Sequence, residues 1–447
     1  MSTKSIQHIM NNKLIIRTLF IVVFSALPLM AMAQQRSISL EEVFSLAEEH
    51  SRSLAVGRQG VEVAKQRIEE AKSGRLPDLD ISLSASYLGN GTLTDRDFSN
   101  SMGVRMPHLG NNVAIEAAQL IYGGGVVDNS IALAHLEHEM ANINLADSHT
   151  RVNLMLSGFY FELCKLYNII DIFDQNIALQ EELIAETEAR IREGVVLPND
   201  ITRQELRLEQ LKLQRREVEN SAKILSSRLA TTIGLDSDTE LLPDTSIASA
   251  TQPQHDEPYW QQLAAESAHA LQRGEVAIAM SERAEKIARA ERLPKVAVVA
   301  ANHFDGPITI EVPVINKNFN YWYVGVGVSF NIASLYKSNR TIARHAMATE
   351  QSRLQLDELR EQTMLDIRAD YIRYNEAIAA VETYIKSLEL AKSNYDIIEK
   401  RYKNDMALYT EMRDAADQLI EAEMHLANAQ INVTLRYYKL LATAGAL

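Results

Sequence analysis

The sequence contains a single cysteine among its 447 residues, Cys164, and it has no excess of positive charge. One thiol excludes an intrachain disulfide framework and any zinc or iron–sulfur site held by several thiolates. The 45 lysines and arginines are outnumbered by 59 acidic residues, which gives a formal net charge of −14. A chain this acidic lacks the broad basic face through which proteins bind nucleic acid.

Catalytic and cofactor-binding motifs are also absent. We find no phosphate-binding glycine loop followed by lysine, and no nucleophile elbow, so we expect neither an enzyme nor a cofactor. His135 and His138 stand three residues apart on one predicted helix, a spacing that could hold a metal, but such pairs are more often a solvated helix face. We expect no metal site, and we expect Cys164 to be a small packed side chain.

The one long apolar run lies at the N-terminus. Lys13 and Arg17 precede 16 largely apolar residues, 18–33, which end in an Ala-x-Ala sequence. This arrangement is typical of a secretory signal peptide, whereas a membrane-spanning helix needs about 20 residues. We therefore expect residues 1–33 to be a signal peptide.

Helix breakers are scarce over long stretches of the chain. No proline lies between residues 108 and 197 or after 313, and no glycine lies between 328 and 444. A helix of about 66 residues is about 100 Å long, and helices on that scale indicate coiled coil rather than globular packing. The predicted long helices span about 126–193 and 338–403, and each precedes a shorter one, at about 199–232 and 410–443.

Apolar residues recur every seven positions along both long helices. One series runs from Leu156 to Ile191 and a second from Ile367 to Tyr402, and the second follows the first by 211 residues throughout. The spacing of seven indicates coiled coil, and the constant offset indicates an internal duplication. The duplication predicts repeats at 34–235 and 259–447, joined by a linker at 236–258, with hairpin turns at about 194–198 and 404–409.

Four segments between the helices have strand character. Residues 79–87 alternate apolar and polar side chains, residues 322–330 alternate large and small ones, and weaker strands are expected at 113–122 and 296–302. Lengths of about nine to eleven residues suit a tilted membrane-spanning strand. Four strands alone would leave unpaired edges in lipid, so copies of the chain would have to share one sheet. The alternative is an ordinary sheet that caps the coiled coil.

Several motifs in this order resemble the outer membrane efflux protein family, the TolC-like channels. They are Leu-Pro before a strand at 76–87 and 293–302, the glycine-rich junction at 119–125, and the turn sequences at 190–194 and 401–405. The resemblance implies a mainly α fold with a small transmembrane β part. Each chain would hold a duplicated helix-strand-strand-helical hairpin repeat. It would form a long antiparallel coiled-coil tunnel and contribute four strands to a shared trimeric β-barrel.

The resemblance also implies a function. The chain would be the outer-membrane exit duct of a tripartite efflux or type I secretion system, passing small molecules or polypeptides passively to the exterior. Its partners would be two further copies in a homotrimer, a periplasmic adaptor (membrane fusion) protein, an inner-membrane transporter and outer-membrane lipid. It would lie in the cell outer membrane and extend into the periplasm. The alternative is a soluble periplasmic coiled-coil scaffold or chaperone. The sequence names neither cargo nor pump class.

The resemblance places two functional sets at the hairpin turns. Glu411 and Asp414, just before Ala415, match an acidic pair that lines the narrow periplasmic entrance, so they are the predicted pore constriction; a solvated pair three apart is the alternative. Ala407 stands where family members carry a basic residue that helps latch the closed state. The residues expected to contact the adaptor are Gly194, Val195, Val196 and Leu197 in the first turn, and Asn404, Asp405, Met406 and Ala407 in the second.

Overall fold

The fold is taken from a computed structural model, which describes residues 35–192, 198–245, 253, 255–311, 313–404 and 406–447. The expected signal peptide, most of the first hairpin turn (194–197) and part of the linker lie outside these residues. The chain divides into two compact units, Met1–Ala47 with Glu162–Ile247, and Glu48–Phe161 with Ala248–Leu447. These units follow packing and not sequence similarity, so the repeat boundaries stay predictions.

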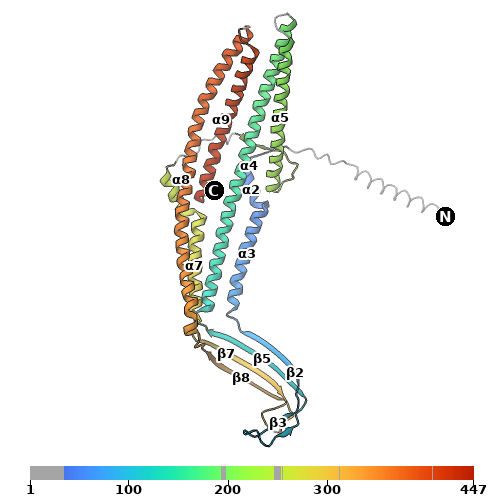
Figure 1. Ribbon diagram of the computed structural model, residues 1–447, viewed down its shortest axis with the longest axis vertical. Helices are drawn as coiled ribbons and strands as arrows, with labels where there is room; N and C mark the ends of the chain where they lie inside the picture. The colour runs from blue at the N-terminus through green and yellow to red at the C-terminus, as the bar shows by residue number, and fades with distance from the viewer. Residues whose placement is uncertain (1–34, 193–197, 246–252, 254, 312, 405) are drawn as a thin grey trace, which may run out of the picture. The chain divides into compact units, whose positions relative to one another are not determined.

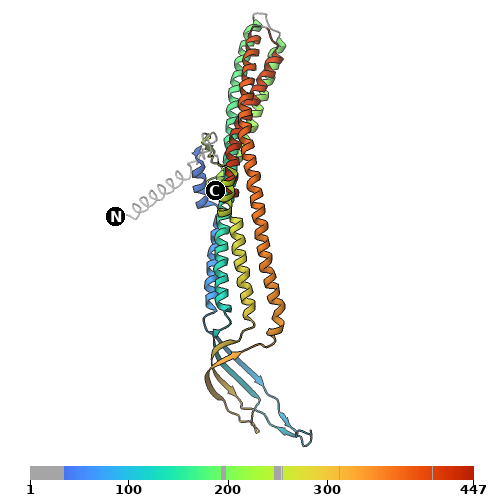
Figure 2. The ribbon, with the colours of Figure 1, turned by 90° about the vertical axis from the view of Figure 1, so that its left-hand side faces the viewer.

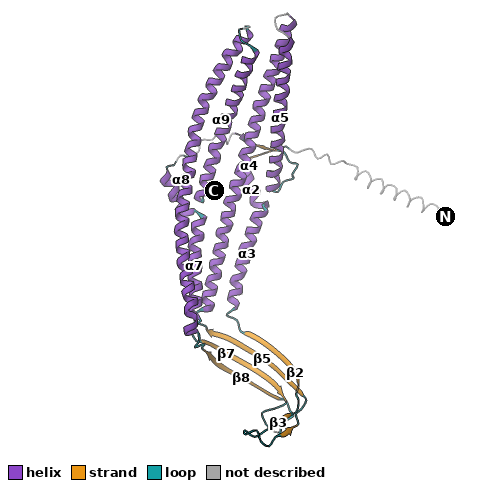
Figure 3. Cartoon of the chain, viewed as in Figure 1, coloured by secondary structure: helices purple, strands orange, loops and turns teal. Residues whose placement is uncertain are grey.

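Long helices make up most of the described chain, and a smaller part consists of strands (Figure 3). The helices are α2 (Leu40–His50), α3 (Arg52–Ser73), α4 (Val126–Arg192), α5 (Pro198–Thr232), α6 (Glu257–Ser267), α7 (His269–Ala290), α8 (Ser334–Lys403) and α9 (Tyr409–Ala444). Among the described residues, no helix combines the length and the hydrophobicity that crossing a membrane requires.

The larger unit contains a four-stranded antiparallel sheet. Its strands are β2 (Asp78–Tyr87), β5 (Leu109–Tyr122), β7 (Lys295–Gly306) and β8 (Phe319–Ser329), in the order β2-β5-β7-β8. A short pair, β3 (Gly91–Leu93) and β4 (Met102–Val104), lies between β2 and β5 in the chain. In the described part of the chain, β2 pairs only with β5 and β8 only with β7, so both outer strands have an open edge.

Helices of the same unit repeat the order of the strands. Ion pairs join neighbours in turn: Arg67 of α3 with Glu137 of α4 at 3.3 Å, Asp147 of α4 with Arg273 of α7 at 2.8 Å, and Glu282 of α7 with Arg353 of α8 at 3.0 Å. The order α3-α4-α7-α8 therefore continues the order β2-β5-β7-β8 (Figure 1). The predicted fold class, a duplicated helix-strand-strand-helical hairpin chain with four strands, is confirmed.

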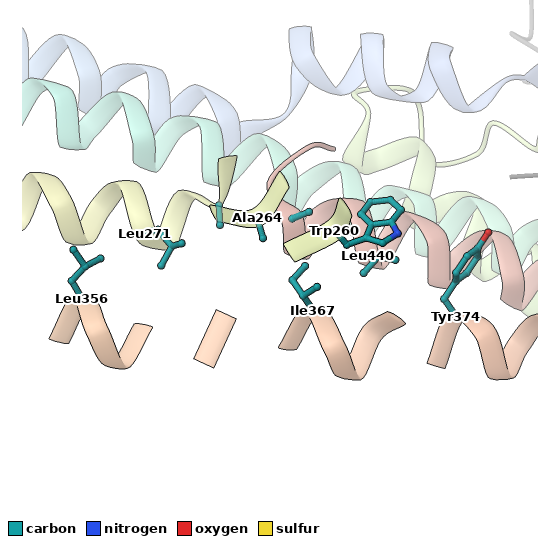
Figure 4. Packing of buried hydrophobic residues seen from close by; sticks show 9 residues of the cluster. Trp260, Ala264, Leu271, Leu356, Ile367, Tyr374 and Leu440 are labelled. Atoms are coloured by element: carbon teal, nitrogen blue, oxygen red, sulfur yellow. The ribbon is translucent and has the colours of Figure 1, made fainter. Parts of the chain in front are cut away.

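The core of the larger unit surrounds Trp260 of α6, which is only 1% exposed. Leu271 of α7, Leu356 of α8 and Leu440 of α9 pack in the same cluster (Figure 4). Ile367 and Tyr374 of α8 also belong to it, and both are members of the second heptad series. Residues of the second heptad series are thus buried where α8 and α9 run side by side (Figure 2).

The smaller unit is an antiparallel helix pair with a short sheet. The strands β1 (Arg36–Ile38) and β6 (Leu241–Pro243) pair in parallel. The end of α4 packs along α5, where Gln204 donates a buried hydrogen bond of 2.9 Å from Nε2 to Oγ1 of Thr187. Cys164 is fully buried in this unit. Burial, with a further effect of Asp244, raises the pKa of its thiol to about 12, as expected for an unreactive packed side chain.

Each shorter helix ends at a glycine in the left-handed conformation, Gly234 (φ 79°) after α5 and Gly445 (φ 78°) after α9. At Gly445 the fit is tight, because an added Cβ would lie 2.2 Å from the carbonyl oxygen of Ser267. Glycine is therefore required there for the end of α9 to pack against the junction of α6 and α7.

We predict that Gly445→Ala destabilises the larger unit. The left-handed conformation alone costs about 1–2 kcal/mol for a residue with a Cβ, and the contact with Ser267 adds to that cost. Denaturant unfolding followed by circular dichroism should show a lower midpoint. Ala446→Ser, at the exposed next position, is the control and should unfold as the parent does. Equal midpoints for all three proteins would contradict the packing described for Gly445.

Candidate functional site: the turn of the second helical hairpin

The turn between α8 and α9 is built on the last carbonyls of α8. The backbone N–H groups of Asn404 and Met406 both donate to the carbonyl of Arg401, at 3.2 and 2.8 Å. The side-chain amide of Asn404 donates to the carbonyl of Lys400 at 2.7 Å. These bonds satisfy acceptors that a helix end otherwise leaves open. Asp405 lies outside the described residues.

Arg401 spans this turn with its side chain. Its Nη2 donates to the carbonyl oxygen of Met406 at 2.9 Å and lies 3.9 Å from Oε2 of Glu411. The ion pair is half exposed and contributes little alone, but the bond to the carbonyl fixes the guanidinium across the turn. Arg401 was not among the site residues predicted from the sequence, because the family resemblance places a basic residue between the turn and the acidic pair, where Ala407 stands.

Glu411 and Asp414 lie three residues apart in the first turns of α9, and both are exposed. Each faces a guanidinium of its own chain: Arg401 lies beside Glu411, and Nη2 of Arg413 donates to Oδ1 of Asp414 at 3.1 Å. The hydrogen bond to Asp414 raises the pKa of Arg413 above its usual value, so this side chain stays charged. The four side chains together carry no net charge, whereas the site predicted from the sequence consisted of the two acids alone.

The surface of the turn includes two exposed apolar side chains. Met406 and Leu408 are exposed, while Tyr402 and Tyr409 are buried behind them with ring centroids 6.5 Å apart. Exposed apolar side chains on a fixed aromatic base are suited to docking against another protein. The corresponding residues of the first turn, 194–197, lie outside the described part of the chain.

The remaining candidates do not form a second site. His138 approaches Asn142, with Nδ1 and Nδ2 3.4 Å apart, and His135 is exposed. Among the described residues, no group of three or more histidine, cysteine or acidic side chains could hold a metal ion.

Comparison with solved structures identifies the fold. VceC, an outer membrane protein of Vibrio cholerae, matches 91% of this chain and 96% of its own, with a TM-score of 0.71 at 14% identity. The MtrE outer membrane channel of Neisseria gonorrhoeae, in its open state, matches 91% of this chain and 88% of its own, with a TM-score of 0.68 at 16% identity. Identities this low establish the fold alone, which is that of TolC-like channels.

Sequence comparison names the family. The family model described as outer membrane efflux protein matches residues 43–235. Over these residues the chain is similar to the outer membrane efflux protein family, the family that its motifs resemble. The proteases secretion protein PrtF of Dickeya chrysanthemi is 26% identical over 164 residues, which are 36% of this chain. The match spans 34% of the length of PrtF.

We predict that Arg401→Met loosens the turn without changing the rest of the hairpin. Loss of a hydrogen bond from a charged donor costs about 1 kcal/mol, which corresponds to roughly fivefold faster amide exchange where the turn opens locally. Hydrogen–deuterium exchange measured by mass spectrometry on peptides covering 402–412 should show the change. Lys400→Met, one residue earlier and also exposed, is the matched control. Equal exchange in both variants would show that Arg401 does not hold the turn.

Proposed function

We propose that this chain is the outer-membrane exit duct of a tripartite efflux or type I secretion machine. It passes small molecules or polypeptides passively to the exterior, lies in the outer membrane and extends into the periplasm. It has no catalytic centre and no energy source of its own. The observation that carries the proposal is the sheet, because its strand register gathers apolar side chains on one face.

The register of the sheet sorts side chains by polarity. One face is mainly apolar and carries Leu79, Ile81 and Leu83 of β2, Val113, Ile115 and Ala117 of β5, Val298 and Ala300 of β7, and Trp322, Val324 and Val326 of β8, with the polar Gln119, Asn302 and Asn320 among them. The opposite face carries Asp80, Ser82 and Ser84 of β2, Asn112 and Glu116 of β5, and His303 and Asp305 of β7, together with Ala114, Val299, Ala301, Tyr321 and Tyr323. This separation suits a sheet with lipid on one side and water on the other.

A soluble periplasmic scaffold, the rival function, would leave the apolar face in water unless another element covered it. Most residues of β2 and β8 are exposed, and Trp322 is 74% exposed. Apolar patches of this extent on a monomer mark membrane or protein contact. The face therefore favours the duct over the scaffold.

The open edges of the sheet support assembly with further copies. Unpaired backbone groups at β2 and β8 are costly in lipid, and pairing β8 of one copy with β2 of the next removes them. These edges differ, so the contact is head-to-tail, and such a contact forms a ring when the rotation from copy to copy closes. The family resemblance sets the number at three, a homotrimer with a shared twelve-stranded barrel.

The two hairpin turns are the proposed contact sites for the partners of the duct. We assign the periplasmic adaptor to residues 194–197 of the first turn and 404–407 of the second. Met406 within the second turn and Leu408 just after it are exposed and apolar. The inner-membrane transporter contacts the duct through that adaptor. Glu411 and Asp414 form the constriction, in which three copies place six carboxylates and, from Arg401 and Arg413, six guanidinium groups.

The charge balance of the constriction predicts opposite effects for two variants. Glu411→Gln with Asp414→Asn leaves the guanidinium groups unopposed, so preference for cations and block by multivalent cations should fall. Arg413→Gln leaves the carboxylates in excess, so both should rise. Planar-bilayer recordings of reversal potential measure the preference, and high salt should reduce both shifts. If neither variant changes selectivity, the pair is a solvated helix face away from the pore.

The two tryptophans of the chain report on membrane insertion. Trp322 lies on the apolar face of the sheet, whereas Trp260 is buried in the helical core. With Trp260→Phe, which leaves Trp322 alone, fluorescence in vesicles of brominated lipid should be strongly quenched, because bromine quenches only by contact. The matched variant Trp322→Phe, which leaves Trp260 alone, should be unaffected. Equal, weak quenching in both variants would favour the soluble scaffold.

A further inference from the structure

The two edges of the larger unit carry matching, uncovered helix faces. On α3, Val56 is 74% exposed and Val63 follows it by seven residues. On α8, Met347 is 73% exposed and Leu354 follows it by seven residues. A spacing of seven brings both members of each pair to one face of their helix. Each face is therefore apolar and open along two turns.

Charged residues flank both pairs at the same spacings but in reverse order. On α3, Arg52 lies four residues before Val56 and Glu70 lies seven after Val63. On α8, Arg340 lies seven residues before Met347 and Glu358 lies four after Leu354. The four charged residues that these spacings bring onto the two faces are Arg52, Glu70, Arg340 and Glu358.

These four charges are unpaired within the part of the chain that the structure describes. All four side chains are exposed, although ion pairs are frequent elsewhere on the same helices, such as Arg67 with Glu137 and Arg353 with Glu282. A reversed order of opposite charges is what two antiparallel helices need in order to pair.

The direction of the chain supplies the antiparallel arrangement. Helix α3 runs toward the sheet and ends at Ser73, just before β2 begins at Asp78. Helix α8 begins at Ser334, just after β8 ends at Ser329, and runs away from the sheet. When β8 of one copy meets β2 of the next, α8 and α3 lie side by side and antiparallel.

We propose that the α8 face of one copy packs against the α3 face of the next in a single register. Met347 lies against Val63 and Leu354 against Val56, while Arg340 pairs with Glu70 and Glu358 with Arg52. The inference rests on the proposed function, which supplies the ring. It adds the residues that join neighbours and the register in which they meet.

Neighbouring registers lose this fit. A shift of seven residues in one direction places Met347 against Val56 but Arg340 against Val63. A shift in the other direction places Leu354 against Val63 but Met347 against Glu70. In both cases a charge meets an apolar side chain and one apolar pair is lost, so the pattern selects one register.

Disulfide cross-linking tests the register directly. Cys164→Ala provides a background without cysteine, because the chain has no other. In that background, Val63→Cys with Met347→Cys, and separately Val56→Cys with Leu354→Cys, should oxidise to covalent trimers that reductant returns to monomers. The single-cysteine variants should stay monomeric on denaturing gels.

An out-of-register pair is the matched control. Val63→Cys with Leu354→Cys displaces the two sulfurs by seven residues, about 10 Å along the helix, which exceeds the reach of a disulfide. Faster cross-linking in this control than in the two matched pairs would overturn the register. A cross-link formed only with a protein other than this chain would show that the partner is not a second copy.

Charge reversal and mass measurement distinguish a failure of the seam, the proposed contact between α8 of one copy and α3 of the next, from a failure of the proposed function. Glu70→Arg should lower the fraction of trimer at a given detergent concentration, and adding Arg340→Glu should restore it. Native mass spectrometry of the parent protein should give three chains. A trimer without the predicted cross-links or the rescue overturns the seam alone. A stable monomer in lipid nanodiscs overturns both the seam and the exit duct.

Discussion

The hydrogen bonds that the outer strands cannot make within one chain are the constraint on which the rest of the structure depends. Strands β2 and β8 each pair on one side only among the described residues. Strand β2 follows α3, and β8 precedes α8. Pairing β8 of one copy with β2 of the next would therefore also bring α8 and α3 of these copies together. In the proposed assembly, membrane insertion, ring closure and the contact between α3 and α8 of neighbouring copies would therefore be one requirement, met first by backbone groups and then by side chains.

Much of the fold could be predicted from the sequence, because its elements have simple periods. The spacing of seven marked α8, and Ile367 and Tyr374 of that series are buried. The alternation at 79–87 marked β2 closely, since one uninterrupted period of two specifies a strand. The strands β5 and β7 extend beyond their expected bounds, to 109–122 and 295–306. Residues such as Asn111 and Asp305 join the ladder by backbone pairing, which side-chain pattern does not reveal.

The candidate site was less accessible to sequence reasoning. The acidic pair could be located by its spacing and its place after the turn, but its electrostatic setting could not. Arg401 reaches Met406 and Glu411 only because the chain reverses between them. Contacts made across a turn depend on its backbone conformation, which a period of seven or two does not encode. Even Arg413, which stands between the two acids in sequence, needed the geometry to show that it bonds to Asp414.

The difference between the two edges of the sheet has a genetic consequence. In the proposed head-to-tail ring, every chain has two neighbours and presents a different edge to each. A copy with a damaged α3 face still offers an intact α8 face, so it can enter a ring that it cannot complete. When such a copy is made together with the normal protein, it would inactivate assemblies in which the other copies are normal. Defects at either edge would therefore behave as dominant alleles, whereas defects in the helical core, which stop a chain from folding, would be recessive.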